Sequence, residues 1–201
     1  HVLDAAGVER IAAHARSAGT RMLALAVAEM TLALQERGAA GLRAVFPVHS
    51  RTGDTWHDSV GWFITNSVLE CDSGDPHHCG RQIKEAIALG DYPLEPLLRP
   101  WGGMPHTPGM FALSWLDHRR LPVYIDPALE PQHVSARIRT TGVMVWFVVN
   151  DTGLHMRCRY PETPQARVGV GGWLRAVSAG LARRANTAPD QHPETLPELH
   201  K

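Results

Sequence analysis

The sequence lacks an excess of charge of either sign, because 20 aspartates and glutamates balance its 20 lysines and arginines. Proteins that bind nucleic acids or anionic membranes carry a basic excess, so this balance argues against both kinds of partner. Long hydrophobic runs are also lacking. The longest apolar stretch, residues 142–149, has the length of a strand and falls short of the about 18–20 residues that span a membrane.

Cysteine is scarce, and the three thiols of Cys71, Cys79 and Cys158 match no disulfide framework. This usage favours a reducing compartment. The first residues have neither the basic nor the apolar segment of a signal peptide, and the sequence starts at His1 rather than at a methionine. We therefore expect a piece of a longer protein that works in the cytoplasm or at the inner face of the membrane.

A zinc site is a possible reading of one cluster, which comprises Cys71, His77, His78 and Cys79. Structural zinc sites pair their ligands at short spacings, whereas two adjacent histidines on one helical turn point apart. We therefore expect a helix start at the surface here and no metal site. A metal-dependent enzyme built on this cluster remains an alternative that metal analysis would test.

What the sequence does contain is typical of a globular domain, with 44 % hydrophobic and 20 % charged residues. Periodicity predicts helices at 4–16, 21–37, 76–89 and 165–184, and strands at 42–48, 62–70, 111–116, 142–150 and 154–160. This order predicts an α/β domain, a mixed β-sheet with flanking helices, over residues 1–185. Residues 186–201 contain three prolines and few apolar residues, which predicts a flexible tail.

The helix predicted at 21–37 is apolar nearly all round, since Met22, Leu25, Val27 and Met30 spread over its whole circumference. A helix without a polar face has to be covered. We expect a second protein segment or a second copy of the chain to cover it, because large exposed apolar patches mark interaction sites.

Motifs of common catalytic sites are missing. No G-x-S-x-G nucleophile turn occurs, and the glycine-rich segment 169–172 lacks the Lys-Ser/Thr ending of a phosphate-binding loop. Two pairs of arginines, Arg137/Arg139 and Arg157/Arg159, repeat at the period of a strand, so each pair shares a face. Such pairs either bind an anionic group or are solvated and paired with acidic residues.

The most informative stretch is Pro47-Val48-His49-Ser50-Arg51, followed after a polar loop by residues 60–67, Val-Gly-Trp-Phe-Ile-Thr-Asn-Ser. It resembles the second half of the condensation-domain superfamily, the chloramphenicol-acetyltransferase-like acyltransferases. There a strand ending near Pro-Val and Arg is followed by V-G-x-F-V-N-T. Residues 92–98 resemble a later Pro-Phe-Glu-like element, and segment 101–105 resembles the mycobacterial polyketide-associated branch. The resemblance extends to about residue 185.

Two features depart from the family pattern. Thr65 separates Phe63-Ile64 from Asn66, whereas the family places the asparagine directly after its Phe-Val. The family's catalytic H-H-x-x-x-D-G is absent, since His77-His78 leads to Gln82-Ile83 where Asp-Gly should stand. In the family that motif lies upstream, in the N-terminal half. The resemblance therefore implies the C-terminal half of a two-subdomain fold, with no catalytic residue of its own and no activity in isolation.

The function implied by the resemblance is transfer of a fatty or polyketide acyl group to a hydroxyl of a lipid or sugar acceptor. The donor would be the thioester of acyl-CoA or of a phosphopantetheine arm, with no bound cofactor. The implied partners are the missing N-terminal half of the same protein and a polyketide synthase or acyl carrier protein. The alternative is a non-catalytic module of the same fold that binds a carrier or a lipid and serves as a scaffold.

Five residues are candidates for substrate binding: Gly61, Thr65, Asn66, Ser67 and Ser114. Gly61 either admits a pantetheine arm or forms a bend. The three polar residues of the strand either bind substrate or simply end it, and Ser114 either faces the channel or is a satisfied core hydroxyl. Because strand residues alternate faces, Asn66 points away from Thr65 and Ser67. We favour Asn66, since a carboxamide both donates and accepts hydrogen bonds.

Overall fold

A six-stranded mixed β-sheet organises the part of the chain that the computed structural model describes, residues 1–51, 54–56, 58–104, 108–133, 136 and 138–187. The strand order is β1-β6-β5-β4-β2-β3. Strand β4 runs parallel to β2 and β5, and the other neighbours are antiparallel. The strands are β1 (Leu3–Asp4), β2 (Leu42–His49), β3 (Ile64–Cys71), β4 (Phe111–Asp117), β5 (Val143–Asn150) and β6 (Gly153–Arg159). The predicted mixed sheet is confirmed.

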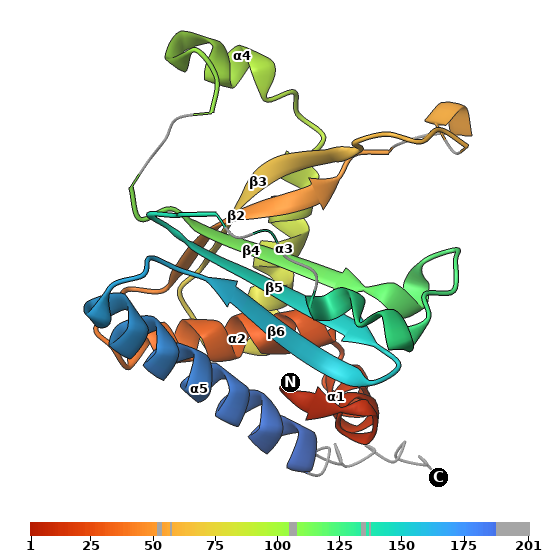
Figure 1. The fold of residues 1–201 in the computed structure, drawn as a ribbon, viewed down its shortest axis with the longest axis vertical. Helices are drawn as coiled ribbons and strands as arrows, with labels where there is room; N and C mark the ends of the chain where they lie inside the picture. The colour runs from red at the N-terminus through yellow and green to blue at the C-terminus, as the bar shows by residue number, and fades with distance from the viewer. Residues whose placement is uncertain (52–53, 57, 105–107, 134–135, 137, 188–201) are drawn as a thin grey trace, which may run out of the picture.

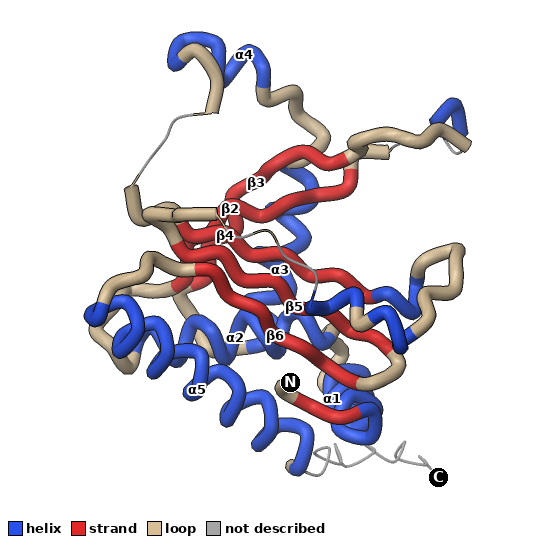
Figure 2. The backbone as a smooth tube through the Cα atoms, in the orientation of Figure 1, coloured by secondary structure: helices blue, strands red, loops and turns tan. Residues whose placement is uncertain are grey.

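Four helices cover one face of this sheet, and a fifth stands away from it (Figures 1 and 2). The covering helices are α1 (Ala5–Ser17), α2 (Met22–Gln35), α3 (Pro76–Leu89) and α5 (Pro164–Asn186). The short helix α4 (Glu95–Leu98) lies in a long excursion between β3 and β4, at the top of Figure 1. The predicted tail lies outside the described residues from residue 188 onward.

Local sequence signals explain where the helices begin. The side chain of Asp4 accepts a hydrogen bond from the backbone N–H of Gly7 at the start of α1. Asp75 accepts from the backbone N–H groups of two residues in the first turn of α3, and Thr163 caps α5 in the same way. Each cap satisfies backbone donors that would otherwise lack a partner. Helix α2 is predicted from residue 21 and begins at Met22, where the preceding residue, Arg21, makes no side-chain cap.

Helix α2 is covered by this chain itself, so the expectation that a partner covers it is wrong. Leu25, Val27 and Met30 are fully buried in the core. Helix α5 supplies much of the cover, and the indole N–H of Trp173 donates to the backbone oxygen of Met30 at 3.2 Å. Self-association through α2 is therefore not expected.

No single helix in the described parts of the chain is long and apolar enough to cross a membrane. Only α1 and α2 taken together pass that test of length and composition, and their axes meet at 93°. The buried position of α2 in the core accounts for its apolar composition.

Strand β1 is absent from the sequence prediction, which placed residue 4 in a helix. It adds to the sheet beside β6, where Leu3 lies opposite Leu154 and the backbone N–H of Val2 donates to Leu154 at 2.8 Å. Gly153 permits this approach. A Cβ at this position would overlap the carbonyl oxygen of Leu3, and its φ of +137° lies in the region that favours glycine.

We expect Gly153→Ala to lower the free energy of unfolding by about 2–4 kcal/mol, because backbone strain and the overlap with Leu3 add up. Urea unfolding of the purified variant measures this loss. Gly102→Ala is the control, since Gly102 also has a positive φ (68°) but would place its Cβ in open space. A loss no larger than that of Gly102→Ala would contradict the close packing of β1 on β6.

The opposite face of the sheet, here called the open face, carries no layer of α-helices in the described part of the chain. One end of it is covered by residues 118–133, where the Asn150 side chain donates to Gln132 at 3.1 Å and both are buried. Towards β2 and β3 the open face carries half-buried and exposed side chains, among them Val45, Asn66 and Val68. The candidate site lies at this end.

Candidate functional site

An apolar groove runs along edge strand β3, between the open face and the excursion that carries α4. Its volume is about 700 Å³. The sheet contributes Val45, Asn66, Ser67 and Val68, and the excursion contributes Leu89, Tyr92, Pro93, Leu94, Pro96, Leu97, Leu98 and Met104. Several large apolar side chains in it are exposed, among them Leu97 at 65 %. Clustered exposed apolar side chains of this kind mark a binding surface.

The excursion owes its shape to glycine and proline. Helix α3 ends at Gly90, where a Cβ would lie 2.9 Å from the Val48 side chain, so the chain turns closely against the sheet. Pro96 lies in the first turn of α4, and Arg99 closes a two-pronged ion pair with Glu95 at 2.8 and 2.9 Å. The charged pair keeps this outlying turn soluble, while the leucines between the prolines line the groove.

Asn66 places a carboxamide in this apolar groove. It lies opposite Pro47 in the β2–β3 register, and like its neighbours Ile64 and Val68 it is exposed on the open face. No described residue is hydrogen-bonded to its side chain. The Asn66 carboxamide therefore has a donor and an acceptor available for a bound molecule.

Thr65 and Ser67 point to the other side of β3, towards the helices. Ser67 is buried, and its hydroxyl has no hydrogen-bond partner among the described residues. Thr65 lines an adjoining pocket of about 520 Å³, which shares Tyr92 and Pro93 with the apolar groove. The strand thus separates the three polar candidates into two sets, as the alternation of strand side chains requires.

Gly61 and Ser114 do not line the groove. Gly61 is exposed in the β2–β3 connection, where a Cβ would lie 3.1 Å from the Phe63 ring. Ser114 is half-buried on β4, opposite Trp146 in the register with β5. Of the predicted residues, Asn66 therefore lines the groove and Thr65 lines the adjoining pocket. Gly61 and Ser114 lie away from both.

Sequence reasoning missed the apolar wall of the groove. None of the five binding residues predicted from the sequence lies in segment 93–104, which is rich in proline and glycine. The available signal was a series of large apolar residues, Leu94, Leu97, Leu98 and Met104, inside a segment otherwise rich in proline and glycine. A solvated connection does not need them.

The arginine pair of β6 is held by the protein. The guanidinium groups of Arg157 and Arg159 lie 5.7 and 5.4 Å from the centre of the Trp146 ring, within the range of a cation–π interaction. Arg159 also donates to the backbone oxygen of Ala136 at 2.8 Å. The other predicted pair cannot be placed, because Arg137 lies outside the described residues.

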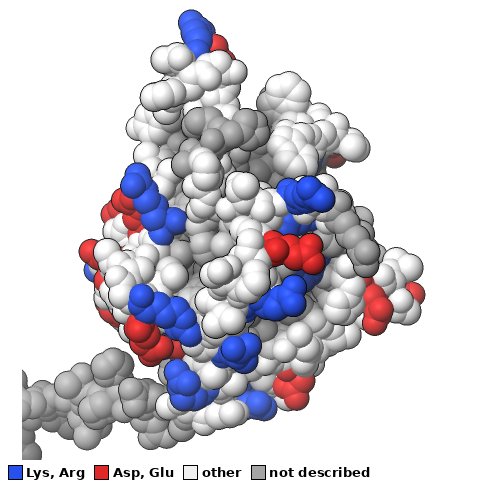
Figure 3. All heavy atoms as spheres, turned by 60° about the vertical axis from the view of Figure 1, so that its left-hand side comes forward, with Lys and Arg blue, Asp and Glu red and all other residues white. Residues whose placement is uncertain are grey.

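Charges of both signs are interspersed over the face shown in Figure 3, with no broad area of one sign. This agrees with the neutral composition. The described residues contain no group of three histidine, cysteine, aspartate or glutamate side chains arranged for a metal ion.

Neither a protein-family model nor a curated protein matches this chain. Its fold is similar to that of several solved structures. PapA2 acyl transferase aligns with a TM-score of 0.73 and 21 % identity, over 92 % of this chain and 43 % of the other. The condensation domain of the Monacolin K polyketide synthase MokA aligns with a TM-score of 0.66 and 13 % identity, over 94 % of this chain and 47 % of the other. The X-domain from teicoplanin biosynthesis aligns with a TM-score of 0.64 and 17 % identity, over 93 % of this chain and 46 % of the other.

The chain spans less than half the length of each of these structures, although almost all of it is aligned. The mixed sheet with its helical layer therefore corresponds to one part of a larger domain. The fold of this chain is that of roughly half of a condensation domain, as the resemblance implied.

Proposed function

We propose that this chain is the C-terminal half of an acyltransferase. The whole protein would move a fatty or polyketide acyl group from a CoA or carrier-protein thioester to a hydroxyl of a lipid or sugar acceptor. The observation that carries the proposal is the apolar groove with the Asn66 carboxamide in it, on a fold shared with an acyl transferase.

The groove suits an acyl chain because its lining is almost wholly aliphatic or aromatic. Each methylene group that leaves water for such a surface contributes about 0.8 kcal/mol. Asn66 can donate to a carbonyl oxygen or accept from a hydroxyl, so it can orient the polar end of a substrate whose chain lies along the leucines. An oriented donor near the reacting carbonyl also stabilises the oxyanion that develops during acyl transfer.

Acyl transfer to a hydroxyl also needs a general base that takes the hydroxyl proton. None of the described residues that line the groove is a histidine, and the chain contains no H-H-x-x-x-D-G. The base would therefore come from the other half of the protein, which would close over the open face. The exposed apolar side chains of the groove support such a contact.

A non-catalytic binding module is the second candidate. The observation that favours it is the similar fold of the teicoplanin X-domain, which is known in a complex with the protein OxyB (TM-score 0.60, 18 % identity). The sequence of the remaining half separates the two functions. An intact H-H-x-x-x-D-G there supports the enzyme, and its loss supports the binding module.

In the full-length protein, we expect Asn66→Ala to lower acyl transfer by roughly 10- to 100-fold, which equals a loss of about 1.4–2.7 kcal/mol of transition-state stabilisation. The reason is that the Asn66 carboxamide lies in the groove on the open face and can both donate and accept a hydrogen bond. Steady-state transfer from an acyl-CoA to a hydroxyl acceptor measures the effect.

Thr65→Val is the matched control, since Thr65 lies next in sequence and faces the adjoining pocket. It should reduce transfer less than Asn66→Ala does. If Thr65→Val alone abolished transfer in a folded protein, the substrate would lie on the other side of β3. If neither variant lost activity, this strand would have only a structural role.

A further inference from the structure

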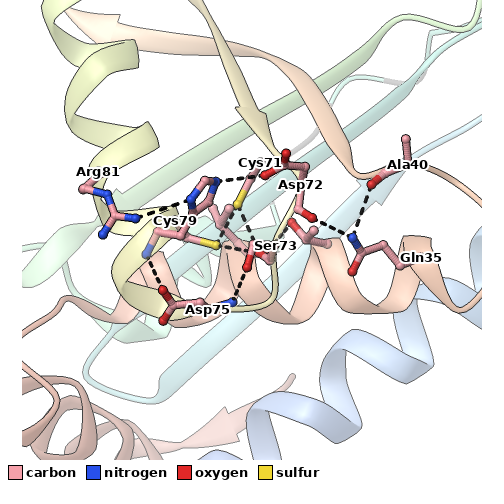
Figure 4. A network of polar contacts seen from close by, with 11 residues as sticks. Gln35, Ala40, Cys71, Asp72, Ser73, Asp75, Cys79 and Arg81 are labelled. Carbon is pink, nitrogen blue, oxygen red and sulfur yellow. Dashed lines mark hydrogen bonds and ion pairs between the residues drawn. The ribbon is translucent and has the colours of Figure 1, made fainter.

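Two buried cysteines meet where β3 joins α3. Cys71 is the last residue of β3 and Cys79 lies in the first turns of α3. Their Sγ atoms are 2.7 Å apart, close to the bond length of a disulfide, about 2.05 Å. Figure 4 shows both sulfurs directed towards each other and towards the backbone of Ser73.

The connection between the two cysteines is fixed by hydrogen bonds. The backbone oxygen of Ser73 lies within hydrogen-bonding distance of both sulfurs, at 3.3 Å from Cys71 and 3.2 Å from Cys79. The hydroxyl of Ser73 accepts from the backbone N–H of Asp75, whose carboxylate caps α3. The side chain of Gln35 donates to the backbone oxygen of Asp72 at 2.7 Å. The loop therefore holds the sulfurs together before any bond forms between them.

The surroundings of the pair give the two thiols different roles. The hydrogen bond with Cys79 lowers the pKa of Cys71, and the positive charge of His78 acts in the same direction. The same hydrogen bond, together with burial, raises the pKa of Cys79. Of the two thiols, Cys71 therefore loses its proton more readily, and thiolates are the nucleophiles of disulfide exchange. Burial raises the pKa of the third cysteine, Cys158, to about 12.

We propose that Cys71 and Cys79 are a redox pair that closes reversibly into a disulfide by exchange with a small-molecule disulfide such as oxidised glutathione. The Cys71 thiolate attacks one sulfur of the oxidant, which forms a mixed disulfide and releases one glutathione. The sulfur of Cys79, after losing its proton, attacks the Cys71 sulfur and releases the second glutathione. The two protein thiols lose two electrons and two protons, and the oxidant leaves as two thiols. Excess glutathione reverses both steps.

The bond would join two elements that line the apolar groove, since β3 carries Val68 and α3 ends at Leu89. Both sulfurs are buried, so exchange requires a brief opening of the first turn of α3. In a reducing compartment such a bond is transient and responds to oxidant. This proposal concerns the junction of β3 and α3 and does not depend on the acyltransferase function.

The test is to expose the folded 201-residue chain to oxidised glutathione, block the remaining thiols with an alkylating reagent, and map the peptides by mass. The expected product links Cys71 to Cys79, while Cys158 is recovered with the alkyl label. Reductant should restore both thiols. Recovery of Cys71 and Cys79 as alkylated thiols, under conditions in which the chain in urea forms disulfides, would overturn the proposal, as would a bond from either to Cys158.

Three variants test the order of steps. Cys79→Ser should stop at the mixed disulfide of glutathione with Cys71, because the resolving thiol is gone. Cys71→Ser should leave Cys79 unmodified over the same time. Cys158→Ser is the control and should form the internal disulfide at the unchanged rate. Glutathione on Cys79 in the Cys71→Ser variant, at the rate seen for Cys71, would contradict the assigned nucleophile.

Discussion

The 201-residue chain on its own should transfer no acyl group from a thioester donor, and the full-length protein should do so. The reason is that the proposed function takes its general base from the other half of the protein, and a positioned acid–base group typically accelerates proton transfer by about 10²–10⁴-fold. Release of the CoA thiol from an acyl-CoA in the presence of a hydroxyl acceptor measures the difference. A loss of at least about 10²-fold relative to the full-length protein is expected.

Histidine variants of the isolated chain give this experiment its control. The histidines nearest in sequence to the candidate strand are His57, which precedes β3, and His77 and His78 at the start of α3. Their replacement by alanine should leave the background rate of thioester hydrolysis unchanged. If the chain alone transferred the acyl group and one of these variants abolished the transfer, the base would lie within this chain and the half-domain interpretation would fail.

Elements with local signals were predicted closely. The Asp75-Pro76 start and the Gly90 stop define α3, and the structure has it at Pro76–Leu89. The Asp151-Thr152-Gly153 turn predicts a hairpin, and β5 and β6 pair across it in antiparallel register. Caps and tight turns depend on residues within a few positions of each other, so a sequence reveals them.

Elements that depend on distant contacts were not predicted. Strand β1 has two residues, and it is a strand only because β6, about 150 positions later, offers a free edge. The apolar groove likewise joins β3 to residues 89–104, and neither segment shows the hollow by itself. Alternation alone predicts that Asn66 lies on the side of β3 opposite to Thr65 and Ser67. Only the positions of the helices show that this side belongs to the open face.

Helix α2 also shows that a sequence does not reveal contacts between distant segments. Its composition correctly predicts that most of the circumference is covered, yet the sequence does not say which segment covers it. The cover comes from α5, where Trp173 donates to Met30 and Arg184 pairs with Glu29 at 2.5 Å. Glu29 is itself buried, and a buried carboxylate requires such a partner. Because α2 is covered by the same chain, its packing contributes to the stability of that chain.

Leu25→Ala should therefore lower the free energy of unfolding of the 201-residue chain by about 3 kcal/mol, within the range of about 2–5 kcal/mol for large-to-small changes in a core. Leu25 is fully buried, so the truncation removes packed methyl groups and leaves a cavity between α2 and its neighbours. Urea unfolding followed by circular dichroism measures the loss. Leu32→Ala on the same helix is the matched control, and because Leu32 is 37 % exposed it should cost less than half as much. Equal, small losses for both variants would mean that α2 is not covered within the single chain, and would restore the partner that its composition first suggested.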